Sequence, residues 1–386
     1  MITRLTIGGD TNVVLDIADY LKKHPNYEVH LAVGPVLKHE VDLTYLAHER
    51  DIPTTVIPSL VNYINPWLNL RAFLGLIEVI SQGKFDIVHT HSSVAGVVGR
   101  MAAFVARVPA IVHHVHGWGI QESMSFAVRT LYLILERICA LFTDRLIAVS
   151  APTIQKGLHY RICKEDKFTL IYNGINLEKF RQPVDQQKVR LELGMEPEDK
   201  IVGMIARLDM QKNPLDFIRA AAIVVKKYPK VQFLIVGDGS LRSECESLIQ
   251  ELDLQGRFFL LGYRDDVYKI LPILTFTVLS SLWEGLPVVF QEAMSAGKPI
   301  IANDVDGARD VVIDGETGYL VTPHQPQEMA ERMLYLLNND VVCYEMGLRA
   351  CKYSERFSSE QMVENIELLY RELSTNHARK LIPDII

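Results

Sequence analysis

The chain has 386 residues and a formal net charge of −7. This length is too great for one ordinary hydrophobic core, so it predicts two domains of roughly 150 to 200 residues each. With 48% hydrophobic and 23% charged residues, the composition excludes a disordered, collagenous or coiled-coil chain. The five cysteines show no paired spacing, so neither a disulfide framework nor a zinc ribbon is indicated, and a reducing cytoplasm fits best. No signal peptide or membrane-spanning stretch is recognisable, and no nucleic-acid partner is expected.

Short β-branched runs alternate with longer helical patterns along the chain, which is typical of βαβ units and a parallel sheet. In the first half, strands are expected near residues 4–9, 28–34, 54–58, 86–91, 110–117 and 145–150, and helices near 11–23, 67–82, 93–106 and 124–142. In the second half, strands are expected near 200–207, 231–239, 257–263, 274–281 and 298–304, and helices near 214–227, 240–252, 287–296 and 326–338. A final helix near 359–375 follows an irregular stretch.

This pattern predicts an α/β protein of two Rossmann-like domains that face each other across a central cleft. We expect an N-terminal domain over residues 1–180 and a C-terminal domain over 181–358, joined by a linker from Pro183 to Lys200. A last helix and tail occupy 359–386 and could, from the pattern alone, fold back on either domain.

An apolar stripe marks the predicted helix over residues 66–80. Such a stripe could lie on a membrane surface, but it more often packs into a core, and we expect core here. The loop over 118–126 is a better place for contact with an acceptor or a lipid. The residues of the stripe are Trp67, Leu70, Phe73, Leu74 and Ile77.

Histidines gather on two neighbouring strands of the first half. His89 and His91 share one strand face because side chains alternate along a strand, and such a pair can bind zinc. His113, His114 and His116 follow on the next strand, and Gly117 permits close approach of a ligand to the backbone. We expect His113 and His114 to be packing residues, and we expect no metal, although zinc remains an alternative.

Two cations lie near a predicted helix start in the second half. Arg207 follows a strand, and Lys212 precedes Asn213 and Pro214, which are predicted as N-cap and first helical residue. A cation at the positive end of a helix is unfavourable by about 0.3–1 kcal/mol, so Arg207 and Lys212 make sense if an anion, such as a diphosphate, binds there. The alternative is two solvated surface cations.

Glycines mark the end of the next strand, where open α/β sheets bind ligands. Gly237 and Gly239 lie there, but the dinucleotide fingerprint fails because its third glycine would be Arg242. The Gly8 and Gly9 pair is equally incomplete, and neither a P-loop nor a nucleophile elbow is present.

Two carboxylates flank another predicted helix start. Glu284 lies in the turn before Pro287, and Glu292 lies one to two turns inside the helix. Backbone N–H groups of Gly285 and Leu286 would point at an anionic or hydroxylated ligand, and ionised carboxylates suit sugar hydroxyls.

These motifs together resemble the family 4 retaining nucleotide-sugar glycosyltransferases, or glycosyl transferases group 1, which have the GT-B fold. The resemblance extends over nearly the whole chain. It rests on the Gly-Gly pair at 8–9, VHTHS at 88–92, His-Gly at 116–117, RLIAVS at 145–150, YNGI at 172–175, Arg-x4-Lys at 207–212, VGDG at 236–239, LGYRDDV at 261–267 and Glu-x7-Glu at 284–292.

The resemblance implies a role for each matched position. Arg207 and Lys212 would bind the donor diphosphate, Glu292 the ribose hydroxyls, and His116 the donor sugar near the reacting carbon. Glu284 would hold the transferred sugar, so that His116, Glu284, Arg207 and Lys212 form the catalytic set. The remaining donor-binding positions implied are Gly8, Gly9, Gly237, Gly262, Tyr263, Arg264, Gly285, Leu286 and Pro287. The resemblance also implies that the final helix and tail over 359–386 cross back onto the N-terminal domain.

Asp304 and Asp306 imitate a D-x-D metal motif. They lie where the family has D-V-G-G, with Asp306 in place of a glycine, so we reject a metal role and question only the local loop shape. A divalent ion is unnecessary where two cations and a helix N-terminus neutralise the leaving diphosphate.

The sequence therefore predicts a cytoplasmic retaining transferase that moves a hexose or N-acetylhexosamine from a UDP-sugar to an acceptor hydroxyl, without a metal or cofactor. By resemblance, the acceptor is a glycan or a lipid-linked glycan of bacterial surface polysaccharide or glycolipid synthesis, which allows peripheral contact with the inner membrane surface. The alternative is a UDP-sugar 2-epimerase on the same fold. A non-catalytic nucleotide-sugar binding subunit is disfavoured because the implied site residues are intact.

Overall fold

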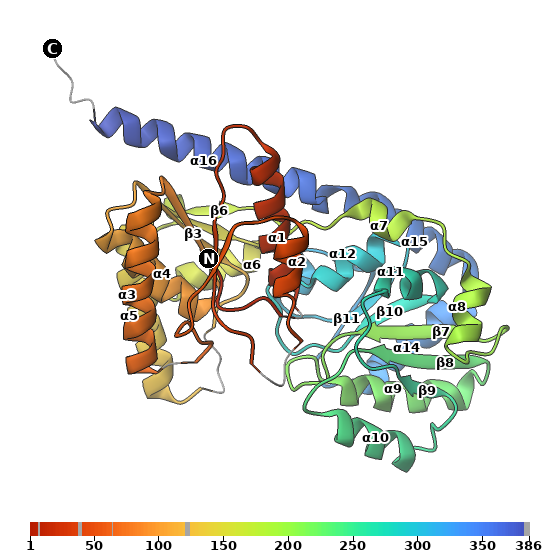
Figure 1. Ribbon diagram of the computed structural model, residues 1–386. Coiled ribbons are helices and arrows are strands. Elements are labelled where there is room, and N and C mark those ends of the chain that lie inside the picture. Colours follow the sequence, from red (N-terminus) through yellow and green to blue (C-terminus); the bar gives the residue numbers. More distant parts are fainter. Residues whose placement is uncertain (7, 38–40, 64, 120–123, 382–386) are drawn as a thin grey trace. The chain divides into compact units, whose positions relative to one another are not determined.

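The computed structural model describes residues 1–6, 8–37, 41–63, 65–119 and 124–381 (Figure 1). The chain divides into two compact units, one formed by 1–173 with 359–386 and the other by 174–358. All of the strand pairs within the three sheets are parallel, so the prediction of two α/β domains with parallel sheets is confirmed.

Unit 1 contains a four-stranded sheet and a two-stranded sheet. The larger sheet has the order β3 (Ile87–His91), β4 (Ala110–Val115), β5 (Arg145–Ala148) and β6 (Phe168–Leu170), and the smaller one pairs β1 (Leu31–Val33) with β2 (Thr54–Val56). The helices are α1 (Gly9–Lys23), α2 (Thr44–Glu49), α3 (Pro66–Gly83), α4 (Ser93–Val105), α5 (Phe126–Phe142), α6 (Ala151–His159), the short η1 (Glu165–Lys167) and α16 (Ser359–Leu381).

The strand expected over residues 4–9 is not formed in the described part of that segment. Residues 1–3 take its place, because Ile2 N donates to Ala32 O, Gly34 N donates to Thr3 O, and His91 N donates to Met1 O. The Thr11 hydroxyl accepts from Thr6 N and donates to Thr6 O at 2.6 Å. The Thr11 side chain thus forms hydrogen bonds with the Thr6 N–H and C=O groups, which a strand would use to pair with its neighbour. The prediction of a strand for this segment was therefore wrong.

Unit 2 contains one six-stranded sheet with the order β12-β11-β10-β7-β8-β9. Its strands are β7 (Lys200–Ile205), β8 (Val231–Val236), β9 (Phe258–Leu260), β10 (Phe276–Leu279), β11 (Ile300–Asn303) and β12 (Gly318–Val321). Its helices are α7 (Leu177–Arg181), α8 (Gln186–Glu192), α9 (Pro214–Lys227), α10 (Arg242–Glu251), α11 (Val267–Ile270), η2 (Leu271–Ile273), α12 (Val288–Ser295), α13 (Asp306–Arg309), α14 (Pro326–Asn338), α15 (Asp340–Tyr353) and η3 (Ser354–Phe357).

Several elements escaped the sequence pattern. The edge strands β6 and β12 are only three and four residues long, and α15 fills most of the stretch that was expected to be irregular. The expected linker over 183–200 contains α8. Short edge strands and polar helices carry little periodic signal, which is why the sequence did not reveal them.

The final helix α16 belongs to unit 1, where it packs against α1 (Figure 1). Its Ile366 is fully buried in a cluster with Val13 and Ile17 of α1 and Val112 of β4. The buried Tyr370 hydroxyl lies 2.6 Å from Nδ1 of His89, the middle residue of β3. Unit 1 therefore needs residues from both ends of the sequence to complete its core.

The apolar stripe of α3 does not lie in the core as a whole. Ala72, Leu76 and Ile80 are the buried residues of this helix, whereas Trp67, Leu70 and Leu74 are exposed. Phe73 and Ile77 are partly buried against the core. The expectation of core was wrong for three of the five residues of the stripe, because the adjacent row of Ala72, Leu76 and Ile80 makes the packing contact. No helix among the described residues is long and apolar enough to cross a membrane.

Replacing Ile366 with alanine should lower the free energy of unfolding of unit 1 by about 2–5 kcal/mol, because it opens a cavity in the cluster shared with α1. Leu368, on the same helix but 63% exposed, is the matched control, and Leu368→Ala should change the free energy by less than about 0.5 kcal/mol. Urea unfolding followed by circular dichroism measures both. Equal losses in the two variants would contradict the packing of α16 described above.

Candidate functional site

Three loops meet at the carboxyl edge of the unit 2 sheet, after β7, β8 and β9. Gly237 has φ 142°, and a Cβ there would lie 2.0 Å from Ala206 O. Gly239 is equally close to the neighbouring loop, with a Cβ position 2.4 Å from Leu208 O. Gly237 N also donates to Gly262 O at 2.8 Å. Only glycine permits this close approach, so both glycines build the floor of the edge where ligands bind in open α/β sheets.

Arg207 and Lys212 lie in the loop between β7 and α9, and each has a carboxylate partner. An Arg207 guanidinium nitrogen lies 3.2 Å from Asp209 Oδ2. Lys212 Nζ lies 2.5 Å from Glu284 Oε1, and the Glu284 side chain is only 6% exposed. From the helix start, the sequence suggested a bound anion or solvated cations and did not reveal these carboxylate partners. The Lys212–Glu284 ion pair joins two of the residues that the sequence singled out separately.

The start of α9 differs in detail from the expectation. Pro214 is the first helical residue, as predicted, but Asn213 has a left-handed backbone and its side chain does not cap the helix. Its amide nitrogen donates to Asp216 Oδ2 at 2.6 Å instead. The Ser280 hydroxyl, at the end of β10, donates to Asn213 O at 2.7 Å. This contact ties the α9 start to the strand that leads to Glu284.

Glu284 precedes α12, which begins at Val288, one residue later than expected, with Pro287 as N-cap. Leu286 is buried. A Cβ on Gly307 would lie 2.0 Å from Gly285 O, so the start of α13 packs directly on the backbone between Glu284 and α12. The backbone in front of α12 is therefore held from two sides.

Glu292 lies in the second turn of α12. Loss of hydration raises the pKa of its carboxyl to about 7, and the Lys179 ammonium opposes that rise. At neutral pH this carboxyl is therefore divided between its protonated and ionised forms, and a small change in its surroundings shifts the balance.

The segment after β9 carries Gly262, Tyr263 and Arg264. Gly262 has φ 68°, and Tyr263 is partly exposed. Arg264 donates two hydrogen bonds to the Asp266 carboxylate, each 2.8 Å, and this pairing holds the pKa of Asp266 below its usual range. The Arg264 charge is thus engaged by Asp266.

In unit 1, Gly8 is the N-cap of α1 and Gly9 its first residue. His116 follows β4, and its Nε2 lies 2.9 Å from His91 Nδ1. Its Nδ1 is buried and has no hydrogen-bond partner among the described residues. Burial lowers the pKa of His116, and the Asp10 charge, next to the two glycines, opposes that change.

Four imidazoles form a layer of ring contacts on neighbouring positions of β3 and β4 and just after β4. His89, His91 and His114 each offer a ring nitrogen within 4.8 Å of the others, which is the arrangement that could hold a metal ion. The His89 and His114 rings are nearly parallel, and the His114 and His116 rings stack at 4.3 Å. One nitrogen of His89 bonds to Tyr370 and one of His91 to His116.

Burial lowers the pKa of His89, His91 and His114 well below the usual value, so these rings are neutral at physiological pH. His113 points to the other side of the sheet, where its Nδ1 lies 2.9 Å from the Thr90 hydroxyl, and its pKa is lowered by burial as well. His113 and His114 are buried, as their predicted packing role requires.

The two aspartates of the D-x-D sequence have separate positions. The Asp304 carboxylate accepts from Arg309 Nε at 2.5 Å and from a terminal guanidinium nitrogen at 3.0 Å. Asp306 is the first residue of α13. Asp304 is therefore already paired with a cation.

Polar residues that the sequence did not single out support the site. Asn303 Nδ2, at the end of β11, donates to Ser280 O and Ser281 O at 2.8 and 3.1 Å. Gln211 Nε2 donates to Trp283 O at 2.9 Å. In the sequence, the available signal for such residues was a polar side chain at the end of a buried strand, as at Asn303. Asn303 and Gln211 connect the Lys212 loop, the Glu284 loop and β11.

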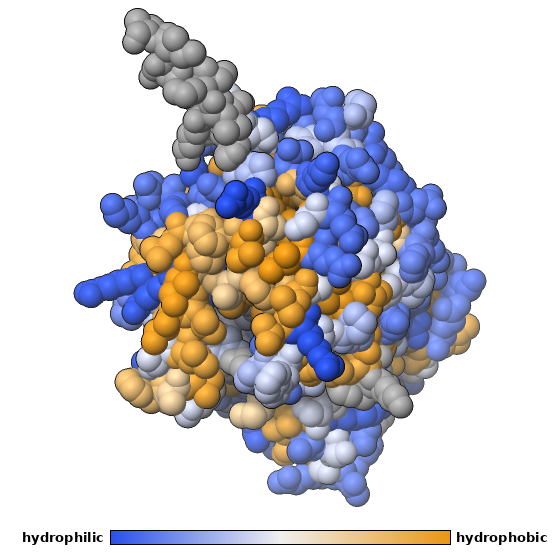
Figure 2. Space-filling model, turned by 60° about the vertical axis from the view of Figure 1, so that its left-hand side comes forward, coloured by the Kyte–Doolittle hydropathy of each residue, from blue (hydrophilic) through white to orange (hydrophobic). Residues whose placement is uncertain are grey.

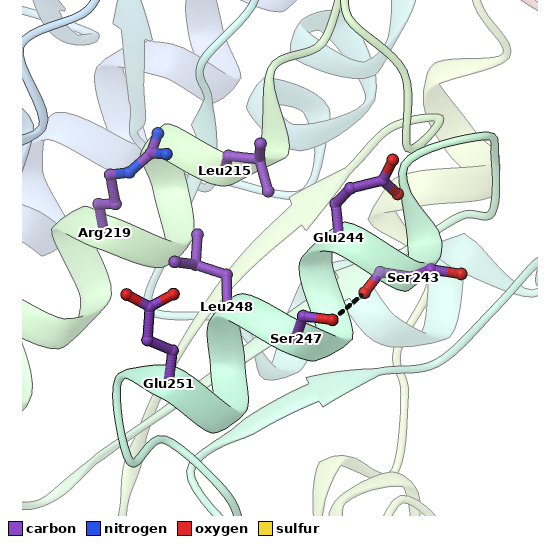
Figure 3. Close-up of a pocket in the computed structure, with 7 residues that line it drawn as sticks. All are labelled: Leu215, Arg219, Ser243, Glu244, Ser247, Leu248 and Glu251. Atoms are coloured by element: carbon purple, nitrogen blue, oxygen red, sulfur yellow. Dashed lines mark hydrogen bonds between the residues drawn. The ribbon is translucent and has the colours of Figure 1, made fainter.

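A separate hollow of about 350 Å³ lies between α9 and α10 (Figure 3). None of the site residues predicted from the sequence lines it, and its Ser247 hydroxyl bonds back to Ser243 O. This hollow is therefore distinct from the loops at the sheet edge. Its lining residues are Leu215, Arg219, Ser243, Glu244, Ser247, Leu248 and Glu251.

Comparison with known proteins gives two family matches and close relatives. Residues 185–357 match the family model "Glycosyl transferases group 1", and residues 7–179 match "Glycosyltransferase Family 4". A putative glycosyltransferase EpsD of Bacillus subtilis is 29% identical over 90% of each chain. The UDP-Gal:alpha-D-GlcNAc-diphosphoundecaprenol alpha-1,3-galactosyltransferase of Escherichia coli is 31% identical over 83% of this chain and 84% of its own.

Solved structures show the same fold. Anabaena Alr3699/HepE in complex with UDP-glucose has a TM-score of 0.82 at 23% identity, covering 96% of this chain and 98% of its own. Sucrose-phosphate synthase from Thermosynechococcus elongatus has a TM-score of 0.81 at 23% identity, covering 96% and 94%. Family models match both halves of the chain, and one relative is more than 30% identical over most of its length. The parallel sheets of both units agree with these matches. The chain therefore belongs to the family 4 glycosyltransferases with the GT-B fold.

Proposed function

We propose that this glycosyltransferase moves a hexose or N-acetylhexosamine from a UDP-sugar to a hydroxyl of a glycan or lipid-linked glycan, with retention of configuration. The observation that carries the proposal is the Lys212–Glu284 ion pair. It places a cation at the start of α9 and a carboxylate at the start of α12, one suited to a diphosphate and the other to a sugar. The Escherichia coli relative, by its name, uses UDP-Gal and a diphosphoundecaprenol acceptor, which supports both substrate classes.

In this proposal the donor diphosphate binds at Lys212 and the half-exposed Arg207, next to the N-terminus of α9. A phosphate would share the Lys212 ammonium with Glu284, which keeps the carboxylate close to the transferred sugar. The rate would come from electrostatic stabilisation of the leaving diphosphate and of an oxocarbenium-like sugar, and the leaving phosphate would take the acceptor proton. No covalent nucleophile is needed.

His116 suits the proposed contact with the donor sugar. Its Nδ1 is a buried ring nitrogen with no partner among the described residues, and such a nitrogen gains a hydrogen bond when a substrate hydroxyl reaches it. His91 bonds to the other ring nitrogen and so fixes the ring orientation. Tyr263, exposed beside Gly262, is the proposed contact for the base.

A UDP-sugar 2-epimerase is the second candidate, and the raised pKa of Glu292 favours it, because a carboxyl with a pKa of about 7 can exchange a proton at neutral pH. Incubation with a UDP-sugar in the absence of acceptor separates the two reactions. The transferase proposal expects no new sugar by NMR. A new C2 epimer would establish the second candidate instead.

Arg207→Ala and Lys212→Ala should each weaken UDP binding by about tenfold or more, because each removes a cation from the proposed diphosphate site. Arg219→Ala is the matched control, since Arg219 is a half-exposed cation on α9 that pairs with Asp216. Titration calorimetry measures the three affinities. Lys212→Ala also leaves Glu284 without its cation, so its melting temperature is measured in parallel. Unchanged UDP affinity in both variants would show that the diphosphate binds elsewhere.

Chelation should leave transfer intact, because side chains and a helix N-terminus meet the diphosphate charge in this proposal. The assay compares turnover with and without EDTA, with magnesium or manganese added back. A loss of turnover that either ion restores would revive a metal role for Asp306 or for the histidine layer.

Glu284→Gln should lower kcat far more than it lowers UDP affinity, because a carboxylate that holds the sugar acts mainly in the transition state. Glu292→Gln should weaken UDP binding itself, because a carboxylate that binds the ribose acts in ground and transition states alike. Steady-state kinetics and UDP titration measure the two effects. If the two variants changed UDP affinity equally and left kcat unchanged, neither the sugar role of Glu284 nor the ribose role of Glu292 would hold.

Proton release from Glu292 on UDP binding provides a further test that distinguishes the Glu292 and Glu284 variants. Ribose hydroxyls donate to the ionised carboxylate, so UDP binding should lower its pKa from about 7 and release part of a proton at pH 7. UDP affinity should therefore rise between about pH 6 and 8. Calorimetry in buffers of different ionisation enthalpy measures the released proton, and Glu292→Gln should abolish it while Glu284→Gln should not.

A further inference from the structure

Helices α3, α4 and α5 of unit 1 expose an unusual amount of apolar surface. Nearly half of the large apolar side chains that are exposed in the described residues lie on these three helices. Figure 2 shows a broad hydrophobic area on the side that carries them. We call this surface the apolar face and define it by Trp67 and Leu74 of α3, Phe104 of α4, and Leu131, Ile134 and Leu141 of α5.

The apolar face is continuous from helix to helix. α4 packs against both α3 and α5. The exposed Phe104 ring of α4 stacks on the Phe142 ring at the end of α5, with centroids 4.7 Å apart. Trp67 of α3 is 78% and Leu141 of α5 is 80% exposed, so large apolar side chains of both helices reach the solvent. A contiguous apolar surface of this kind indicates an interaction site on a folded protein.

The charges that reach the surface on these three helices are mostly positive, with three arginines against the exposed Glu78. The three helices contain two acidic residues, Glu78 and Glu136. Glu136 is buried and bonded to Arg100, so it does not contribute to the surface. Arg71 of α3 and Arg137 of α5 are exposed, and Arg129 of α5 is partly exposed.

We propose that the apolar face docks on the surface of a lipid bilayer that contains anionic lipids. Apolar side chains on neighbouring helices with arginines beside them are the pattern of an interfacial membrane contact, in which the side chains enter the acyl boundary and the cations meet lipid phosphates. A symmetric pair of copies would bring the same patch together, so the arginines of both would face like charges. The face therefore suits anionic lipid better than a second copy of the chain.

This surface is inferred from exposure and charge, and it does not rest on the proposed sugar transfer. It would bring the enzyme to an acceptor carried on a membrane lipid. Loss of membrane binding and loss of UDP binding are separate measurements, so failure of one proposal can be told from failure of the other.

The test is flotation of the full chain with phosphatidylcholine vesicles, with and without phosphatidylglycerol. Leu141→Glu and Ile134→Glu should each lower the partition onto phosphatidylglycerol vesicles by about tenfold or more, because an inserted apolar side chain becomes a charge. Leu191→Glu is the matched control, since Leu191 is an equally exposed leucine on α8 of unit 2, 81% against 80%. The control should bind vesicles like the original chain, and all three variants should keep its UDP affinity.

The arginines make a second, separable contribution. Arg71→Glu and Arg129→Glu should each lower binding to phosphatidylglycerol vesicles by about fivefold and leave binding to pure phosphatidylcholine unchanged. Three results would overturn the proposal: no binding of the original chain to either vesicle, equal losses in Leu141→Glu and Leu191→Glu, or a dimer by light scattering that Ile134→Glu converts to a monomer. The last would identify the face as a contact between copies.

Discussion

The ion pair between Lys212 and Glu284 is the interaction on which the proposed donor site depends. It joins the loop after β7 to the loop after β10, and its carboxylate is almost fully buried. Leaving a buried carboxylate without its cation raises the free energy by several kcal/mol, so separation of the two loops is strongly unfavourable. Gln211 and Ser280 add hydrogen bonds between the same loops. A donor that binds here would meet a cation, a carboxylate and two helix starts whose positions are already fixed, which is the condition for electrostatic catalysis.

In unit 1, the residues around the proposed sugar contact are held in place by neutral groups rather than by an ion pair. Four imidazoles on β3, on β4 and just after β4 lie too close together to carry charge, and burial lowers the pKa of each. Their neutrality allows them to stack as a packed layer, with Tyr370 of the final helix bonded to one edge and His116 at the other. The last helix therefore affects the proposed sugar contact through packing. This connection explains why a helix at the end of the chain belongs to the unit that contains the first residues.

Periodicity in the sequence was enough to predict the parallel α/β architecture and the central helices, and α9 and α14 have the predicted bounds. It failed where tertiary contacts determine the local structure or the buried face of a helix. The Thr11 side chain replaces a strand ladder at Thr6, and α3 buries the row through Leu76 while Leu74 faces outward. The sequence also proposed charged residues for the donor site, but it did not reveal their partners. The pairing of Lys212 with Glu284 joins residues 72 positions apart, and no local spacing rule could reveal it.

The central claim is that sugar is transferred from a UDP-sugar with its anomeric configuration kept. Proton NMR of the product formed from a UDP-sugar and a lipid-linked acceptor tests it most directly, because the coupling of the anomeric proton reports the configuration of the new bond. The account predicts the configuration that the sugar has in the donor. A product of opposite configuration would contradict the account, because it would require a base that activates the acceptor from the other face of the sugar.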